Sequence, residues 1–318
     1  MPRAVPHRSA VSDLVASRPV TVAEAWPKQA CRAGGRYLAL TKPRVVELLL
    51  ITTLPAMILG AGGLPDVGLI AAVLVGGALA AGGANTINCW IERDRDQLMR
   101  RTRHRPLPAG TVEPARALAF GIVLEVAAFG LLWGAANLLA AALALAATLF
   151  YVFVYTIWLK PRTAQNIVIG GAAGAVPVLV GWAAVTGTLE APAWLLFAVV
   201  FCWTPAHFWA LALRYRDDYA AAGFPMLPVV KGERYAATQI LGYTVIVVAL
   251  SLTLPLVASV GVVYVAAAAA LGAAFIVQAA RLRLDPSSAR AIAFFSLSNG
   301  YLALLFAAIA LDVLLRAR

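Results

Sequence analysis

Repeated apolar runs of roughly twenty residues, long enough to cross a hydrocarbon core about 30 Å thick as helices, constrain this chain more than any other feature. Hydrophobic residues make up 62% of its 318 residues, whereas soluble domains contain about 45–50%. Ala and Leu dominate the runs, which favours helices over a barrel. We predict an all-α integral membrane protein with nine transmembrane helices near residues 46–62, 68–90, 116–134, 137–158, 165–186, 192–213, 236–257, 260–280 and 291–314.

The basic residues are distributed unevenly between these spans. If the N-terminus is cytoplasmic, 24 of the 26 Lys and Arg residues fall on the cytoplasmic side, in agreement with the positive-inside rule. The opposite loops are short and carry Asp66 and Glu190. Topology therefore explains the net charge of +11, and no nucleic acid is predicted as a partner. Because most polar residues share the cytoplasmic face, we expect a reaction centre to open there.

The first forty residues are basic and lack the apolar core of a secretory signal. We predict a flexible cytoplasmic segment over 1–40 and a membrane domain over 41–318. The composition favours a bacterial cytoplasmic (inner) membrane, with the mitochondrial inner membrane as the alternative, since an Arg-rich leader is also typical of transit peptides. Cys31, Cys89 and Cys202 have neither zinc-like spacing nor an even number, so no disulfide framework or zinc site is indicated.

Three oxygen-bearing side chains, Asn88, Glu92 and Asp96, occur four residues apart at the cytoplasmic end of the second span. We call them the acidic stripe, because each four-residue step turns a helix by only about 40° and they share one face. Two carboxylates and an amide suit Mg²⁺, because substrate phosphates and water can complete the coordination of this ion. A diphosphate is the natural partner. A charge cluster that only sets topology explains the spacing equally well.

A second acidic pair, Asp217 and Asp218, follows the sixth span on the same membrane face. Adjacent side chains on a helix point about 100° apart, so we expect one carboxylate to reach a metal and the other to pair locally. The sequence does not distinguish the two roles.

Six cations accompany these acidic groups. Arg101 and Arg105 follow the acidic stripe in an arginine-rich stretch, and the other four lie before the first span and after the fourth. Each of those four alone is typical of an interface anchor, since Lys and Arg commonly extend to the membrane surface. Around two acidic clusters, their joint presence suits the forked hydrogen bonds that neutralise phosphate oxygens. They are Lys42, Arg44, Arg101, Arg105, Lys160 and Arg162.

His207 lies within the sixth predicted span, where an imidazole is uncommon. We expect it to bind iron or handle a proton, because iron is a natural partner of histidine and intramembrane ionisable residues are often functional. The alternative is a neutral histidine that is hydrogen-bonded to a neighbouring helix.

With these residues in place, residues 38–314 resemble the UbiA-type intramembrane prenyltransferases. That family has nine helices around a central cavity, and two acidic motifs face each other across it. Its first motif is written Asn-x-x-x-Asp-x-x-x-Asp, which the acidic stripe matches with Glu92 at the middle position. The arginine-rich RTRHRPLPAG segment that follows also resembles the family but does not select the acceptor.

Other segments are similar to the heme-farnesylating branch of that family. They are LTKPR at 40–44, NIVIGGAAGAVPVLVGWAAVTG at 166–187, the segment from Trp203 to Leu213, DDYAAAGFPMLPVV at 217–230 and FFSLSNGYLALLF at 294–306. The resemblance implies transfer of farnesyl from farnesyl diphosphate to a vinyl group of heme b with addition of water, which gives heme O. A quinone precursor or another tetrapyrrole is the alternative acceptor. A transporter is a weaker alternative, since no inverted repeat is evident.

The resemblance also implies how the site is assembled. The acidic stripe, Asp217 and Asp218 hold Mg²⁺, the six cations neutralise the diphosphate, and Lys160 and His207 complete the catalytic set. The partners so implied are farnesyl diphosphate, heme b, the lipid bilayer and a downstream heme A synthase.

Overall fold

The computed structural model describes residues 34–317. Most of the predicted 1–40 segment, with Cys31, lies outside these residues. The residues from Arg36 onward form one compact unit. Its elements are α2 (Pro43–Ala61), α3 (Val67–Asp96), α4 (Pro114–Ala135), α5 (Leu138–Leu149), the π-helix η1 (Phe150–Leu159), α6 (Asn166–Thr186), α7 (Ala191–Arg214), α8 (Arg216–Ala221), α9 (Leu227–Lys231), α10 (Glu233–Leu252), the 3₁₀ helix η2 (Leu254–Leu256), α11 (Val262–Leu284) and α12 (Ser288–Arg316).

Nine helices within residues 34–317 are long and apolar enough to cross a membrane, which confirms the predicted all-α fold and its spans. Local sequence explains several helix starts. Pro43, Pro114 and Pro192 occupy the first turns of α2, α4 and α7, where a missing N–H costs no hydrogen bond. The Asp66 carboxylate accepts a hydrogen bond from the Leu69 N–H and caps α3.

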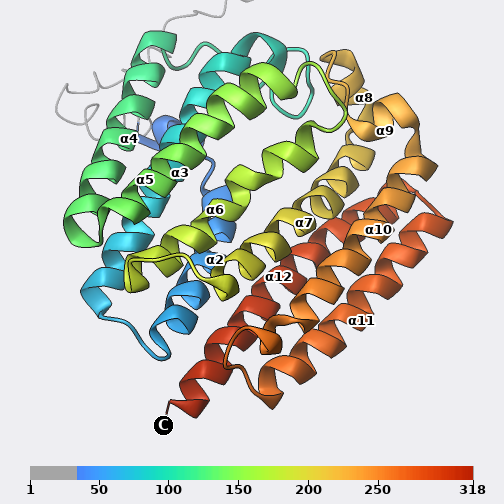
Figure 1. Cartoon of the computed structure of the whole chain (residues 1–318). Helices are drawn as coiled ribbons and strands as arrows, with labels where there is room; N and C mark the ends of the chain where they lie inside the picture. The colour runs from blue at the N-terminus through green and yellow to red at the C-terminus, as the bar shows by residue number, and fades with distance from the viewer. Residues whose placement is uncertain (1–33, 318) are drawn as a thin grey trace, which may run out of the picture. The chain divides into compact units, whose positions relative to one another are not determined.

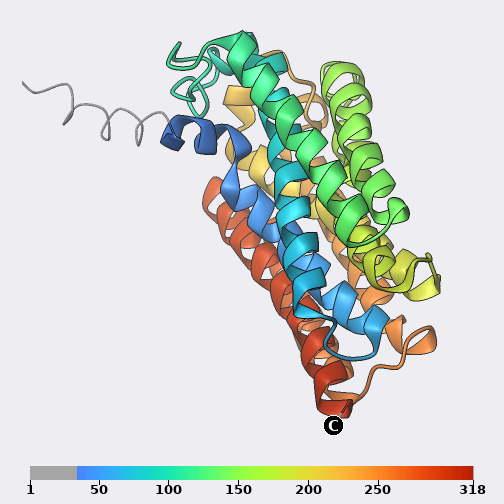
Figure 2. The same cartoon turned by 90° about the vertical axis from the view of Figure 1, so that its left-hand side faces the viewer.

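Within residues 36–317 the long helices run side by side along one axis (Figures 1 and 2). Neighbours in the chain contact one another from α3 through α4, α5, α6, α7, α10, α11 and α12. The α2 helix closes this sequence by contacting both α12 and α3, and α2–α6 and α7–α12 contacts cross it. The first and last spans are therefore brought together by packing.

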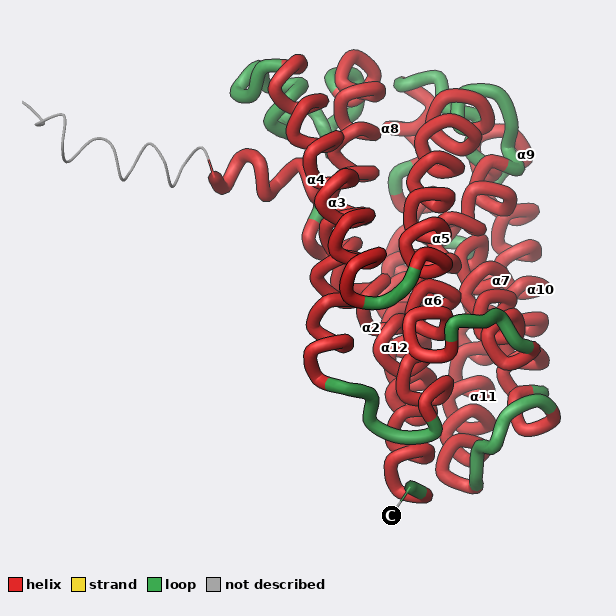
Figure 3. The backbone as a smooth tube through the Cα atoms, turned by 60° about the vertical axis from the view of Figure 1, so that its left-hand side comes forward, coloured by secondary structure: helices red, strands yellow, loops and turns green. Residues whose placement is uncertain are grey.

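One end of this unit carries nearly all the polar segments that the sequence analysis selected. The end of α3, the loop after it, the end of η1 and the short helices α8 and α9 all lie there (Figures 1 and 3). The α3 helix continues six residues past its predicted end at residue 90, to Asp96. The entire acidic stripe is therefore helical, as its spacing requires.

Candidate active site

The acidic stripe lies on the buried face of the last turns of α3. Asn88 is 1% exposed, Glu92 6% and Asp96 3%, whereas the side chain of Asp94 between them is 80% exposed. Charged side chains are almost never this buried unless they are paired. The burial therefore requires partners for each member of the stripe.

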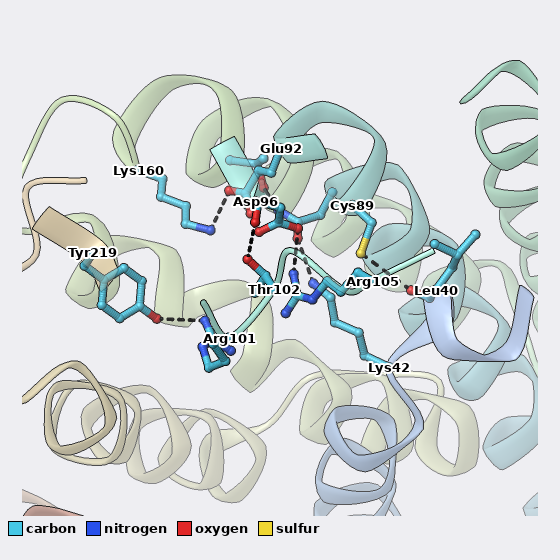
Figure 4. A network of polar contacts seen from close by, with 12 residues as sticks. Leu40, Lys42, Cys89, Glu92, Asp96, Arg101, Thr102, Arg105, Lys160 and Tyr219 are labelled. Carbon is cyan, nitrogen blue, oxygen red and sulfur yellow. Dashed lines mark hydrogen bonds and ion pairs between the residues drawn. The ribbon is translucent and has the colours of Figure 1, made fainter. Parts of the chain in front are cut away.

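Each member of the stripe contacts a different cation, and Figure 4 shows the cations beside Glu92 and Asp96. The contacts are Lys42 Nζ to Asn88 Oδ1 at 2.7 Å, Lys160 Nζ to Glu92 Oε1 at 2.5 Å, and Arg105 Nη1 to Asp96 Oδ2 at 2.8 Å. Three cations thus face two carboxylates and one neutral amide. The surplus positive charge favours an anionic ligand.

The backbone before α2 directs Lys42 toward the stripe. Lys42 has φ 54° and is the only residue other than glycine with a positive φ among those described. A following proline disfavours the right-handed helical region, and the side-chain amide of Asn85 donates to the Thr41 carbonyl at 3.2 Å. Strained conformations of this kind cost about 1–3 kcal/mol and persist where surrounding structure holds them. Here the backbone conformation of Lys42 directs its ammonium group to Asn88.

The π-helix η1 places Lys160 directly after its last residue. Tyr155 packs so closely on Gly170 of α6 that a Cβ there would lie 2.2 Å from the ring. The Lys160 ammonium lies 5.8 Å from the Tyr155 ring centroid and 4.8 Å from that of Phe224, both favourable cation–π distances. The amine is therefore held by Glu92 and by two aromatic rings.

The second acidic pair divides into two different environments. Asp218 Oδ2 accepts a hydrogen bond from the Arg101 backbone N–H at 3.1 Å, and the Arg101 side chain contacts the Tyr219 hydroxyl at 3.4 Å. Asp217 is exposed and has no such partner among the described residues. The structure thus joins Asp218, rather than Asp217, to the loop that follows the acidic stripe.

Two of the six predicted cations lie outside this network. Arg44 is exposed on the first turn of α2. Arg162 is exposed as well, and its guanidinium donates to the carbonyls of Ile157 and Trp158 at the end of η1. The structure therefore brings Lys42, Arg105 and Lys160 onto the stripe and Arg101 onto Asp218, but leaves Arg44 and Arg162 apart.

The pKa values of these cations reflect what each one faces. Burial lowers the pKa of the Lys42 amine, whose hydrogen-bond acceptor is the neutral amide of Asn88. Burial also opposes the charge of Lys160, but the Glu92 carboxylate outweighs it and raises the pKa of the Lys160 amine. Arg105 behaves in the same way, with its pKa raised by Asp96 against the effect of burial. Of the three cations that contact the stripe, Lys42 is the one whose acceptor is neutral.

The donor set suits one divalent cation that a substrate helps to hold. The ion pair of Glu92 Oε1 with Lys160 lacks hydrogen-bond angles, so this buried oxygen has no hydrogen-bond partner among the described residues. No group of three or more His, Cys, Asp and Glu side chains gathers within residues 34–317. Mg²⁺ typically uses one or two carboxylates plus water and substrate phosphates, which these residues fit.

His207 lies apart from these charges, where α7 packs on α12. Its Nδ1 is 2.7 Å from the Ser298 hydroxyl oxygen. The ring stacks on Trp203 and Phe295, with centroids 4.2 and 4.4 Å away. The hydrogen bond to a neighbouring helix, which the sequence analysis kept as an alternative, is therefore present.

Two contributors to the site were absent from the sequence analysis. Asn88 Nδ2 donates to the Thr156 hydroxyl at 3.2 Å, and Phe224 lies beside Lys160. Thr156 precedes Lys160 by four residues, a spacing that puts two side chains near one face and could have indicated it. Phe224 follows α8 and carries no comparable signal.

Comparisons with known proteins agree with this architecture. Residues 49–306 match the UbiA prenyltransferase family. The chain is 56% identical to protoheme IX farnesyltransferase 1 of Saccharopolyspora erythraea over 87% of this chain and 89% of that protein. It is 55% identical to the protoheme IX farnesyltransferase of Frankia casuarinae, over 87% of this chain and 97% of that protein.

Solved structures of lower sequence identity share the fold. A digeranylgeranylglyceryl phosphate synthase has a TM-score of 0.72 at 19% identity, over 88% of this chain and 98% of its own. A UbiA homolog from Archaeoglobus fulgidus, bound to GPP and Mg²⁺, has a TM-score of 0.61 at 19% identity, over 86% of this chain and 99% of its own.

Proposed function

Because the chain belongs to the UbiA prenyltransferase family, we propose that this prenyltransferase moves farnesyl from farnesyl diphosphate to a vinyl group of heme b. Water is added in the same reaction, which gives heme O and diphosphate. Protoheme IX farnesyltransferases match most of the chain at 52–56% identity, and this supports the choice of donor and acceptor. A quinone precursor or another ring is the alternative acceptor.

The observation that carries the proposal is the pairing of the acidic stripe with three separate cations. Arg105 and Lys160 each face a carboxylate, whereas Lys42 faces the neutral amide of Asn88, and a bound anion would balance the surplus positive charge. Each cation can move from its carboxylate or amide to a phosphate oxygen by side-chain rotation. We propose that diphosphate binds here, with Arg101 as a fourth donor from the adjoining loop.

We propose that Mg²⁺ binds with the diphosphate at Asn88, Glu92 and Asp96, together with Asp218 from the second pair. When bound, it supplies positive charge that stabilises the departing diphosphate. Glu92 Oε1 supports this placement, because it contacts the Lys160 ammonium but accepts no hydrogen bond among the described residues. Asp217, on the exposed side of α8, then pairs locally or faces water.

The reaction breaks the bond between farnesyl C1 and a diphosphate oxygen, and the bonding electrons leave with the diphosphate. Lys42, Arg105 and Lys160 stabilise this growing negative charge, which is the larger part of the catalytic effect expected for such a step. The allylic cation is attacked by the heme vinyl group. Water then adds to the resulting cation beside the ring and loses a proton. The first cation must be kept away from water until the vinyl group attacks it.

The test is to incubate membranes that contain the protein with farnesyl diphosphate and heme b, with Mg²⁺ or with a chelator. We expect heme O, detected by mass, only when Mg²⁺ is present. A parallel incubation replaces heme b by 4-hydroxybenzoate as a quinone precursor. A prenylated quinone precursor without any heme O would overturn the proposed acceptor while leaving the prenyl transfer intact.

We also propose that the stripe faces the cytoplasm of a bacterial cell, with the N-terminus on the same side. The positive-inside charge distribution and the bacterial sources of the relatives support this orientation. Single-cysteine variants labelled by an impermeant reagent in intact cells test it, since a cysteine at exposed Thr188 should react and one at exposed Arg103 should not.

A heme A synthase in the same membrane is the proposed consumer of the product, and co-purification from native membranes tests that association.

A further inference from the structure

The imidazole of His207 is held on several sides by residues of α7 and α12. Trp203 and Phe295 cover its two faces, and Ser298 meets its Nδ1 edge. Trp203 also donates its indole N–H to the Ser298 carbonyl at 3.0 Å. Ser298 thus contacts both Trp203 and His207 of α7, and these contacts hold the imidazole ring in one orientation.

The hydrogen bonds of Ser298 determine where His207 carries its proton. The Ser298 hydroxyl lies 2.7 Å from the Phe295 carbonyl oxygen and 2.7 Å from His207 Nδ1. A carbonyl can only accept, and a hydroxyl has one proton to donate. Each short contact contains a proton only if the hydroxyl donates to the carbonyl while Nδ1–H donates to the hydroxyl. The lone pair of the neutral ring is therefore on Nε2.

This lone pair has no partner in the structure: His207 forms a hydrogen bond through Nδ1 only, and Nε2 contacts no donor among the described residues. His207 as a whole is 8% exposed. A histidine that binds a metal through one nitrogen almost always donates the N–H of the other to a fixed acceptor. His207 has this arrangement before any metal is bound.

We propose that Ser298 is a positioning residue that keeps the proton of His207 on Nδ1, so that Nε2 binds the iron of the heme substrate. This proposal rests on the proposed function, because it takes heme as the acceptor. Coordination at this point would hold the macrocycle at one height and one tilt beside α7 and α12, and so present a vinyl group reproducibly. A histidine that only fills space between two helices would be expected to have partners for both ring nitrogens, because buried polar atoms are normally hydrogen-bonded.

The first test is the tautomer of His207 in the full-length protein in nanodiscs, measured by ¹⁵N NMR of labelled histidine without heme. His207→Gln identifies the signal, and His104→Gln removes a histidine on an exposed loop as the matched control. We expect the Nδ1-protonated pattern in the native protein and in Ser298→Thr, and loss of that preference in Ser298→Ala. An Nε2-protonated ring in the native protein would overturn the proposal.

The second test adds heme b without farnesyl diphosphate and records the optical and electron paramagnetic resonance spectra. We expect a histidine-ligated iron signature that is lost in His207→Gln, weakened severalfold in affinity in Ser298→Ala, and retained in Ser298→Thr and His104→Gln. An unchanged spectrum in His207→Gln overturns the ligand assignment, even if the native protein forms heme O in the separate assay with farnesyl diphosphate. A histidine-dependent spectrum without heme O formation supports this assignment and contradicts the proposed transfer instead.

Discussion

The acidic stripe on α3 and the His207 cluster between α7 and α12 both bury polar side chains, but the two clusters are stabilised by different interactions. Both place polar groups in a largely apolar helix bundle. The stripe contains two carboxylates, and cations from before α2, from the loop after α3 and from the end of η1 contact it. The His207 cluster is neutral and relies on hydrogen bonds and ring stacking. The difference shows that substitutions should affect the stripe through charge balance and the His207 cluster through geometry.

The largest expected effect comes from Asp96→Asn. It removes one charge with little change in volume, and Arg105 keeps an oxygen acceptor, so the protein should fold and insert. Transfer should fall by at least about 10³-fold, at the upper end of losses seen when one stabilising group is removed. Heme O formation at saturating Mg²⁺ measures it. Asp94→Asn, on the exposed face of the same helix, is the control, and equal activity of the two variants would leave Asp96 with only a topological role.

Lys160→Met should be next in size. It removes a buried cation and leaves Glu92 without its counter-charge, which is costly because breaking a buried ion pair typically destabilises by about 3–5 kcal/mol. We expect turnover to fall by about 10²-fold and the unfolding temperature in detergent to drop. Arg290→Met breaks an exposed pair with Asp285 and should change neither quantity appreciably. Similar results for both variants would show that burial of the stripe is unimportant.

Gly170→Ala tests the packing that positions Lys160. A methyl group there would lie 2.2 Å from the Tyr155 ring, so Tyr155 and the end of η1 must shift. Overpacking of this kind costs about 1–3 kcal/mol, and turnover should decline with it. Gly174→Ala, one turn further along α6 with open space around its Cβ, is the matched control. Thermal unfolding and initial rates of both variants decide the point.

Asp217→Asn and Asp218→Asn compare two adjacent carboxylates. Only Asp218 accepts a hydrogen bond from the loop that follows the stripe, and a hydrogen bond to a charged group contributes about 1.5–3 kcal/mol. We expect Asp218→Asn to lower the rate by about tenfold or more and to raise the Mg²⁺ concentration needed for half-maximal activity, with a smaller effect of Asp217→Asn. The reverse order would assign the metal-facing role to Asp217.

Trp203→Phe should have the smallest effect on the rate of prenyl transfer. It keeps an aromatic ring against His207 but removes the indole N–H that donates to Ser298, a loss of about 1 kcal/mol for a neutral hydrogen bond. The Mg²⁺ dependence should be unchanged, because no charge is altered. A large change in Mg²⁺ dependence would mean that the two clusters are coupled, contrary to their separation in the structure.

Much of the site was predictable because local spacing on a helix is a property of the sequence. Asn88, Glu92 and Asp96 share a face wherever α3 packs, Lys160 occurs at the predicted end of the fourth span, and Arg105 occurs in the arginine-rich stretch after the stripe. Their pairing was not predictable. Lys42 and Asn88 are 46 residues apart, and Arg101 and Asp218 are 117 apart, so only helix packing brings them into contact. The exposed positions of Arg44 and Arg162 depend on the same packing.

The sequence by itself determined the all-helical membrane fold, its nine spans and the acidic stripe, since hydrophobic length and helical periodicity are local physical properties. Tertiary structure alone decided which cation faces which oxygen, that Asp218 rather than Asp217 joins the stripe's loop, and that Ser298 holds His207. These outcomes depend on the rotation and depth of each helix relative to its neighbours. Side-chain contacts between packed helices set both, and no periodicity within one segment specifies them.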